Sequence, residues 1–359
     1  MSTTRNARLA ANFRKIEPYV PGEQPDLSDM VKLNTNENPY PPSPKVAEAV
    51  RNLDANTLRL YPDPSSTALV NAIAQRYGLG EDQVYVGVGS DDVLAISFMT
   101  FFNSGKAILF PDITYSFYDV WAELFQIPYE RPALDADFNL RLEDYMGSNG
   151  GVVIANPNAP TGVVQDLDFL RQVIEANRDV IVIIDEAYID FCDASSALPL
   201  IQEYDNVVIV QTFSKSRSMA GVRIGYAMAQ PELIQAMNDV RYSFNSYPMS
   251  RLSVAAGVAA LQDEEYFQET VAKVIETREK TKRELHRLGF TFQDSMTNFI
   301  FATHDRVPAQ IIFEKLREMH IFVRHFQANR IDNYLRISIG TNEEMKRFLD
   351  AVHEIVGSY

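Results

Sequence analysis

The sequence predicts an α/β protein with two unequal parts. A large domain should contain a mainly parallel sheet covered by helices on both faces, and a smaller α+β domain should follow it. Short apolar segments rich in β-branched residues alternate with helical segments between about residues 45 and 245. Strands that are apolar on both faces are typical of a buried parallel sheet. From about residue 250 the chain turns to long, charged helical sequence with two further strand-like segments.

Length and composition set limits on the class of protein. The chain has 359 residues, of which 46% are hydrophobic and 23% charged, as in soluble globular proteins of two domains. Its net charge of −15 argues against a nucleic-acid partner, which needs clustered lysine and arginine. Cys192 is the single cysteine, so no internal disulfide can form and a reducing compartment is expected. The first residues lack the apolar core of a signal peptide and no stretch is long enough to span a membrane, so we expect a cytoplasmic protein without a membrane partner.

The first elements follow two proline-rich stretches, 36–44 and 61–66, which we expect to be loops. Ser65 is predicted to cap a helix that Gly78 ends. The sheet strands are then predicted at 83–88, 106–110, 150–155, 180–185, 206–213 and 223–229, with helices at 91–102 and 166–177 between some of them. Functional residues should lie at the carboxyl ends of these strands.

The smaller domain is predicted to begin with a helix from Glu264 to Leu285, followed by strands at 298–303 and 334–340. A last helix should open at Thr341, because Glu344 completes a capping box with it. Its apolar face consists of Met345, Phe348, Leu349, Val352 and Ile355.

Polar residues follow four of the predicted strands. Gly89, Ser90 and Asp91 form a helix start that is either a simple cap or an anion site made of backbone N–H groups. The stretch NPNAPTG, residues 156–162, is a turn fixed by prolines. Asp185 ends an apolar strand and is costly to bury unpaired, so it either caps a helix or meets a cation from the protein or a ligand.

The fourth strand end carries Ser214 and Lys215, thirty residues after Asp185, and this spacing can bring Lys215 and Asp185 to one sheet edge. A solvated loop lysine is the simplest interpretation. A partly desolvated lysine, however, reacts readily with an aldehyde, and a buried aspartate can keep a pyridine nitrogen protonated. The glycine–serine helix start, Ser214 and Arg223 can hold a phosphate. Together these groups point to pyridoxal phosphate.

The same residues carry a resemblance to a known family. Asp185-x-x-Tyr188, then Ser214-Lys215, then Ala220-Gly221-x-Arg223-x-Gly225 resembles the fold-type I, class II aminotransferases. More closely, the chain is similar to the histidinol-phosphate aminotransferases. The stretches IEPY, LNTNENPY, RLYPDP, ITYSFY, PTG, DEAYIDF, TFSKS, AGVRIG, NSYP and LRISIGT occur in the order typical of that family and span nearly the whole chain.

The resemblance implies roles for individual residues. Lys215 would bind the cofactor covalently and move the proton during catalysis, Asp185 would pair with the pyridine nitrogen, and Tyr188 would donate to the 3-oxygen. The remaining cofactor contacts would come from Ser90, the backbone amide of Asp91, Tyr115 stacked on the ring, Asn158, Ser214, Arg223 and, across a dimer interface, Tyr61. Arg336 would bind the anionic group of the substrate, with Tyr19, Asn36 and Arg324 nearby. No metal site is implied.

Two positions depart from the family pattern. Ala159 stands where an asparagine often precedes Pro-Thr-Gly, so Asn158 or Asn156 would supply the bond to the 3-oxygen. Ser216-Arg217 replaces the frequent Ala-Phe after the lysine, and we expect Arg217 to point into solvent.

The expected organisation is an N-terminal arm (1–35) packed with the small domain, a large cofactor-binding domain (36–250) and a small domain (251–359). The expected protein is a homodimer with shared active sites that converts an amino donor and an oxo acid. Histidinol phosphate with 2-oxoglutarate is the favoured pair. An aromatic amino acid aminotransferase is the alternative, and a decarboxylase of a phosphorylated amino acid is more distant. A ligand-sensing regulator would need a DNA-binding segment for which neither end has the length or charge.

Overall fold

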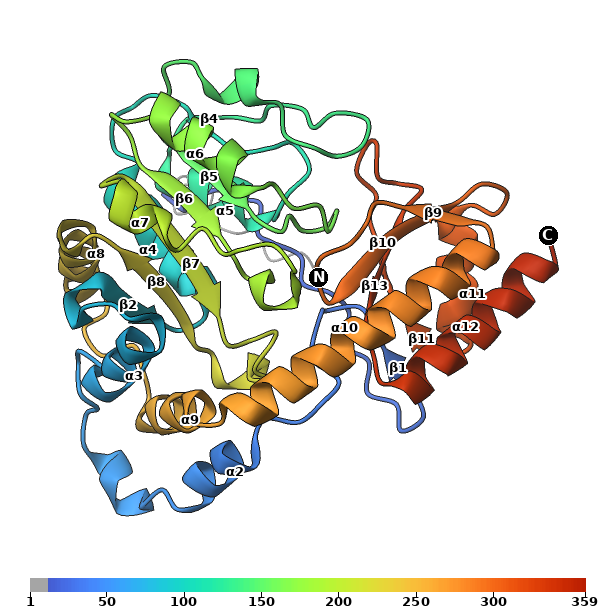
Figure 1. Ribbon diagram of the computed structural model, residues 1–359, viewed down its shortest axis with the longest axis horizontal. Coiled ribbons are helices and arrows are strands. Elements are labelled where there is room, and N and C mark those ends of the chain that lie inside the picture. The colour runs from blue at the N-terminus through green and yellow to red at the C-terminus, as the bar shows by residue number, and fades with distance from the viewer. Residues whose placement is uncertain (1–11) are drawn as a thin grey trace.

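The computed structural model describes residues 12–359, so the first eleven residues of the predicted arm lie outside the described part. Two bodies are built around two separate sheets, and the helix α10 (Glu264–Arg287) runs from one body to the other (Figure 1). No helix within residues 12–359 combines the length and apolar composition that a membrane span requires.

The larger body contains a seven-stranded sheet in the order β2-β8-β7-β6-β5-β3-β4. All neighbours pair in parallel except at β8, which runs antiparallel to both β7 and β2. The prediction of a mainly parallel sheet is therefore confirmed. The strands are β2 (Val84–Gly87), β3 (Ile108–Leu109), β4 (Tyr129–Glu130), β5 (Val152–Ala155), β6 (Val182–Asp185), β7 (Val207–Thr212) and β8 (Gly225–Ala229).

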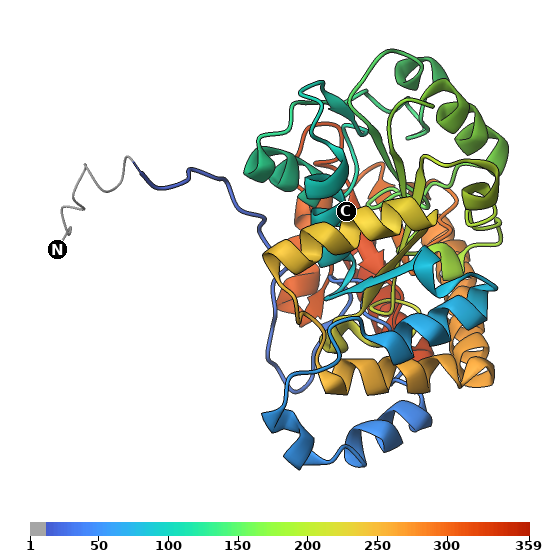
Figure 2. The same cartoon turned by 90° about the vertical axis from the view of Figure 1, so that its left-hand side faces the viewer.

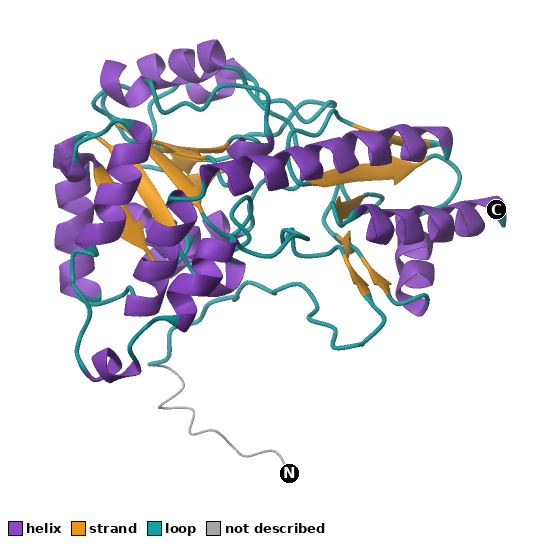
Figure 3. Cartoon of the chain, turned by 60° about the horizontal axis from the view of Figure 1, so that its bottom comes forward, coloured by secondary structure: helices purple, strands orange, loops and turns teal. Residues whose placement is uncertain are grey.

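Helices cover both faces of this sheet (Figure 3). Side chains alternate along each strand, so Ile184 and Ile209 belong to the core of one face, and Ile183 and Val208 to the core of the other. One face packs on α2 (Pro44–Arg51), α3 (Thr67–Tyr77), α6 (Leu167–Ala176), α7 (Leu200–Glu203) and α9 (Arg251–Leu261). The other packs on α4 (Ser90–Phe101), α5 (Phe117–Phe125) and α8 (Pro231–Phe244). Short 3-10 helices occur at η1 (Ala55–Arg59), η2 (Glu81–Gln83), η3 (Leu142–Tyr145), η4 (Ile189–Phe191) and η5 (Ala220–Val222).

The smaller body has an antiparallel sheet in the order β12-β13-β10-β9. Its strands are β9 (Phe290–Phe292), β10 (Phe299–His304), β12 (Arg324–His325) and β13 (Leu335–Ser338), and its helices after α10 are α11 (Ala309–Glu318) and α12 (Asn342–Gly357). The N-terminal strand β1 (Val31–Lys32) pairs in parallel with β11 (Ile321–Phe322). The short N-terminal strand thus pairs with the smaller body, whereas α2 and α3, which follow it, pack on the larger sheet. Because α9 contributes Ala256 and Ala260 to the core of the larger body, we propose that the large domain extends through α9.

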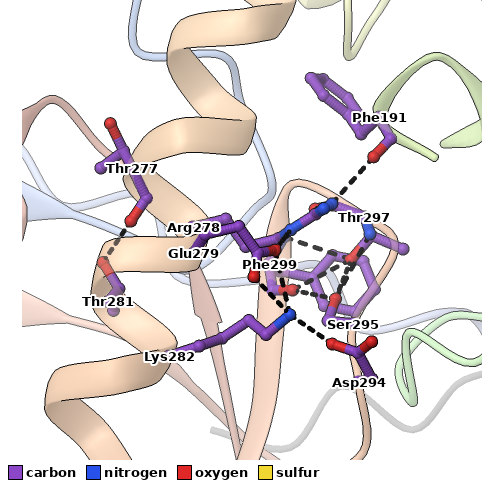
Figure 4. A network of polar contacts seen from close by, with 10 residues as sticks. All are labelled: Phe191, Thr277, Arg278, Glu279, Thr281, Lys282, Asp294, Ser295, Thr297 and Phe299. Atoms are coloured by element: carbon purple, nitrogen blue, oxygen red, sulfur yellow. Dashed lines mark hydrogen bonds and ion pairs between the residues drawn. The ribbon is translucent and has the colours of Figure 1, made fainter. Parts of the chain in front are cut away.

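Helix α10 is tied to the connections on both sides of it (Figure 4). The guanidinium of Arg278 is buried and donates to the carbonyl oxygens of Phe191, 2.8 Å away, and Thr297, 3.0 Å away. Phe191 belongs to η4, which follows β6 of the large sheet and whose Phe191 side chain packs in the core of the smaller body, whereas Thr297 leads into β10. One arginine therefore joins the two bodies close to the edge where Tyr188 lies.

The helix caps test two sequence predictions. The capping box of Thr341 and Glu344 is confirmed at the start of α12. The prediction that Ser65 caps α3 is wrong. The residue before the helix is Ser66, in a left-handed conformation, and the carboxylate of Asp63 accepts from the Thr67 amide at 2.7 Å. An aspartate further from the helix supplies the cap because the left-handed turn at Ser66 brings it back.

Candidate active site

Asp185 ends β6 as a deeply buried carboxylate, with 5% of its surface exposed. The phenol of Tyr118 donates to Oδ2 at 2.8 Å and the Ala187 amide donates to Oδ1 at 3.2 Å. Burial raises the pKa of Asp185 to about 6. Within residues 12–359 no lysine, arginine or histidine nitrogen lies within 4.0 Å of this carboxylate. The Asp185 carboxylate can therefore accept a hydrogen bond from an N–H group of a bound ligand.

Lys215 follows β7, the neighbour of β6 in the sheet, and Asp185 pairs with Val210 in that ladder. The two functional groups therefore lie at the same edge of the sheet. The Nζ of Lys215 donates to the Thr35 carbonyl at 3.3 Å and lies 5.8 Å from the centre of the Tyr188 ring. The side chain of Asn38 donates to the Lys215 carbonyl at 3.1 Å, which fixes the backbone that carries the amine.

Tyr188 is held by a chain of hydrogen bonds from the N-terminal segment. The side-chain amide of Asn36 donates to the Tyr188 phenol at 3.0 Å, and the Ser338 hydroxyl donates to Asn36 Oδ1 at 2.9 Å. Asn36 is buried and adopts φ 57°. Phe299 packs edge-on against the Tyr188 ring with centroids 5.2 Å apart. Both bodies and the N-terminal segment meet at this tyrosine.

The start of α4, residues 89–91, forms a candidate anion site with Arg223 at the same edge of the sheet. Gly89 precedes the helix with φ 85°, and a Cβ there would lie 2.3 Å from Nη2 of Arg223. A Cβ on Gly225 would lie 2.3 Å from the Ser90 nitrogen, so two glycines permit β8 and α4 to approach this closely. The free N–H groups of a helix start beside an arginine bind anions. Arg223 also pairs with Asp91, Nη2 to Oδ2, at 3.1 Å.

Aromatic side chains connect the start of α4 with Asp185. The phenol of Tyr115 donates to Asp91 Oδ1 at 2.7 Å, and its ring packs edge-on against Tyr118 with centroids 5.7 Å apart. Burial raises the pKa of the Tyr115 phenol well above its usual value. Ser214 lies in the same region, where its Oγ accepts from Thr212 Oγ1 at 3.0 Å. The structure thus brings Ser90, Asp91, Tyr115, Asp185, Tyr188, Ser214, Lys215 and Arg223 to one side of the sheet.

The two asparagines of the 156–162 turn differ in their surroundings. Asn156 exchanges two hydrogen bonds with the backbone of Gln165 and so closes the turn. Asn158 accepts from the hydroxyl of Thr114 at 2.7 Å and donates to the Ile113 carbonyl at 2.9 Å. The contacts of Asn158 therefore reach the segment that carries Tyr115, and those of Asn156 do not.

A cleft of about 630 Å³ opens beside this edge, between the N-terminal segment and the two bodies. Tyr19, Tyr115 and Arg324 are among its lining residues. Arg336 donates to the Asn34 carbonyl at 3.0 Å, but its Nε is buried without a hydrogen-bond partner in the described chain. Burial lowers the pKa of this guanidinium. An unsatisfied buried donor is the kind of group that a substrate anion can complete.

Two predicted residues lie elsewhere. Tyr61 is 77% exposed, stacks on Tyr247 and shares no hydrogen bond with the other predicted site residues of the described chain. The prediction that Arg217 points into solvent is wrong, since only 8% of it is exposed. Its guanidinium stacks over Phe267 at 4.0 Å and donates to the Ala260 carbonyl at 2.9 Å. A flat, weakly hydrated guanidinium can be buried against an aromatic face.

Sequence reasoning also missed two residues that support the site. Tyr118 is the hydrogen-bond donor to Asp185, and Thr212 supports Ser214. Tyr118 stands three residues after Tyr115, so the spacing of one helical turn was the available signal.

Fold and site together define the class of protein: a pyridoxal-phosphate-dependent transferase of fold type I. A model of the aminotransferase class I and II family matches residues 28–352. The chain belongs to this family, which depends on pyridoxal phosphate, and the resemblance seen in the sequence is confirmed at this level.

Similar proteins carry a more specific name. A histidinol-phosphate aminotransferase of Clostridium botulinum (strain Okra / Type B1) is 50% identical over 343 residues, covering 96% of this chain and 97% of that protein. One from Brachyspira hyodysenteriae is 49% identical and covers 97% and 98%. The crystal structure of histidinol-phosphate aminotransferase from Sinorhizobium meliloti in complex with pyridoxal-5'-phosphate matches with a TM-score of 0.84 and 26% identity over 91% of each chain.

Proposed function

We propose that this chain is a histidinol-phosphate aminotransferase of histidine biosynthesis that works in the cytoplasm. It would convert histidinol phosphate and 2-oxoglutarate into imidazole-acetol phosphate and glutamate, and the reverse. The observation that carries this proposal is the 50% identity to a protein of that name over 96% of the chain. Arg324 at the cleft, with Arg336 opposite it on the neighbouring strand, supports it, because a phosphate-bearing substrate needs more positive charge than a carboxylate does.

Pyridoxal phosphate fits the edge of the sheet. When bound, it supplies an electron sink that stabilises the charge left when the substrate carbon loses a proton. We propose that Asp185 keeps a proton on the ring nitrogen. Burial raises the pKa of this carboxyl to about 6, and within residues 12–359 no cation lies within 4.0 Å of it, so the ring nitrogen would supply one. Tyr188 would donate to the 3-oxygen, and Asn158 would add a second contact there.

The amine of Lys215 would bind the cofactor covalently and later act as the general base. It lies at the same edge as Asp185, and in the described part of the chain a long contact of 3.3 Å to the Thr35 carbonyl is the one hydrogen bond of its Nζ. A weakly held amine would be able to take a proton from the substrate carbon and give it up again. Tyr115 would stack on the pyridine ring of the cofactor. Its hydrogen bond to Asp91 fixes the orientation of its phenol.

The phosphate of the cofactor would sit at the start of α4, on the amides of Ser90 and Asp91 and the side chains of Ser214 and Arg223. The substrate anion would bind Arg336 and Arg324, with Tyr19 and Asn36 beside it. The buried Nε of Arg336, which has no hydrogen-bond partner among residues 12–359, supports that placement.

We also propose a homodimer with shared sites. Large apolar side chains are exposed around η1 and the end of α8, namely Leu58, Leu60, Tyr61, Phe244 and Tyr247. An exposed patch of this kind is typical of a subunit interface. Tyr61 would cross that interface and donate to the phosphate of the cofactor in the partner subunit.

The test is a steady-state comparison of amino donors with purified enzyme and 2-oxoglutarate. Histidinol phosphate should have a higher kcat/KM than phenylalanine or tyrosine. A preference for phenylalanine would favour the aromatic aminotransferase, and carbon dioxide release from phosphothreonine would favour a decarboxylase.

A further inference from the structure

The segment that carries Tyr61 is an extended loop with its aromatic side chain directed outward. Tyr61 is 77% exposed, yet its ring is not free. It stacks on Tyr247 with centroids 4.7 Å apart and 28° between the planes. Tyr247 is itself 43% exposed, so the pair stands on the surface rather than in a core. A stacked aromatic pair favours one side-chain direction, which an isolated exposed tyrosine would not keep.

Three further hydrogen bonds hold the same loop, two to its backbone and one to a side chain. Arg251 Nη2 donates to the Tyr61 carbonyl at 2.6 Å, and Arg241 donates to the Pro64 carbonyl. The hydroxyl groups of Ser65 and Tyr242 lie 3.0 Å apart. Charge-assisted bonds from arginine are stronger than bonds between neutral groups.

All of these contacts come from one stretch, 241–251, where α8 ends and α9 begins. In Figure 2 the blue segment with α2 and η1 lies beside α9 at the margin of the molecule. The loop between η1 and α3 has no regular structure of its own. It is held in place by residues 241–251, which are distant from it in the sequence.

We propose that Tyr247 and Arg251 are positioning residues that hold Tyr61 in the direction from which it reaches the cofactor phosphate of the partner subunit. This inference rests on the proposed sharing of the active sites. Tyr247 fixes the ring and Arg251 fixes the backbone. Their effect falls on the partner's active site, while the site of their own chain depends on the partner's copies. A substitution of Tyr247 or Arg251 should therefore impair the active site of the partner subunit rather than that of its own chain.

The first measurement is the dissociation constant of pyridoxal phosphate, followed by the fluorescence of Trp121. This is the single tryptophan, and its ring lies 6.2 Å from that of Tyr115. Replacing Tyr247 by leucine should raise the dissociation constant roughly three- to tenfold, the value of a stacked aromatic pair. Tyr247→Phe keeps the stack and should bind like the wild type. Tyr359→Leu, at a similarly exposed tyrosine, is the matched control and should also bind normally.

The second measurement separates action in trans from action in cis. Tyr247→Leu chains are mixed with inactive Lys215→Ala chains, and subunit exchange is verified. In each mixed dimer one site combines an intact Lys215 with a Tyr61 that an intact Tyr247 holds. After random exchange half of the dimers are mixed and each has one intact site of two, so transamination should recover up to about a quarter of the wild-type value. If Tyr247 served its own subunit, both mixed sites would be defective and no recovery would occur.

Tyr61→Phe mixed with Lys215→Ala is the reference pair. Recovery for Tyr61 without recovery for Tyr247 overturns this inference and leaves the shared site intact. No recovery for either pair overturns the sharing and the inference together. An unchanged dissociation constant in Tyr247→Leu also overturns the inference. Should Tyr247→Leu fail to dimerise, Arg251→Gln keeps the ring in place and takes over both measurements with the same expectations.

Discussion

Arg324 and Arg336 face each other across the antiparallel strands β12 and β13, where they form one register pair. Both guanidinium groups lie near the same ring, 5.7 and 5.6 Å from the centre of Phe326. Like charges placed opposite each other are destabilising. The burial of Arg336, with a smaller effect from Arg324, lowers the pKa of Arg336. A doubly charged anion between them would relieve this repulsion.

The first prediction concerns this pair. Arg336→Ala should weaken glutamate and histidinol phosphate alike, because either anion needs that guanidinium. Arg324→Ala should weaken histidinol phosphate by roughly 1.5–3 kcal/mol, the range for a charge-assisted hydrogen bond, and leave phenylalanine nearly unchanged. The measurement is kcat/KM for each donor, with Arg317→Ala, whose partner Glu23 lies at the surface, as the control. An equal loss for phenylalanine and histidinol phosphate in Arg324→Ala would contradict a phosphate-specific role.

A second prediction concerns Lys215. Lys215→Ala should retain pyridoxal phosphate through Asp185, Ser214 and Arg223 but lose the covalent bond and the general base. Transamination should fall by roughly 10³-fold or more. Single-turnover absorbance and the intact mass of the loaded protein check both expectations. Lys45→Ala, at an exposed lysine bonded to the Gln262 carbonyl, should remain active. Full activity in Lys215→Ala would exclude the proposed mechanism.

The third prediction is a pH dependence of stability. Burial raises the folded-state pKa of Asp185 from 3.8 to about 6. Between these values the unfolded chain has lost a proton that the folded chain still holds, so folding becomes less favourable as the pH rises. Above about pH 6 the penalty is complete and on the order of 3 kcal/mol. In protein freed of cofactor, Asp185→Asn should therefore gain stability over the wild type between pH 4 and 6.

Chemical denaturation at several pH values measures this difference. Glu186 remains in both proteins, and its pKa, raised to about 7 by burial, gives both the same background slope. A difference that does not change with pH would show that Asp185 is ionised in the folded protein throughout.

The fourth prediction concerns Arg217. Its guanidinium lies between Phe267, 4.0 Å away, and Phe213, 5.4 Å away. Removing it empties a packed site and takes one of several donors from the Ala260 carbonyl, which also accepts from the Asp263 amide at 3.5 Å. Arg217→Ala should lower the free energy of unfolding by about 2–4 kcal/mol, whereas Arg171→Ala, in an exposed pair with Glu203, should change it by less than about 1 kcal/mol. Equal effects in urea denaturation would place Arg217 among surface arginines.

The sequence predicted the long strands of the large sheet well. The segments 180–185 and 206–213 became β6 and β7 because their side chains are apolar on both faces. The strands β1, β4 and β12 have two residues each, too few to show any periodicity, and they were not predicted, whereas the apolar stretch 321–323 did indicate the strand β11. Their pairing comes from tertiary packing.

The errors have a common physical cause. Arg217 is buried by Phe267, fifty residues further along the chain, and Tyr118 meets Asp185 at a separation of 67 residues. Residue type at a strand end predicts the chemistry of a site. Which distant side chain completes or shields it depends on the fold. The same holds for the left-handed Ser66, where backbone conformation moved the cap to Asp63.

The pairing of β1 with β11 has a consequence for the synthesis of the protein. Residues 31 and 32 leave the ribosome early, but their partners, 321 and 322, emerge only near the end of translation. Asn36 likewise waits for Ser338 before it can hold Tyr188. Contacts of such sequence separation form slowly and leave unpaired strands exposed in the meantime. A nascent chain that has completed its large sheet thus still lacks a finished active site, and activity begins only when almost the whole polypeptide has been made.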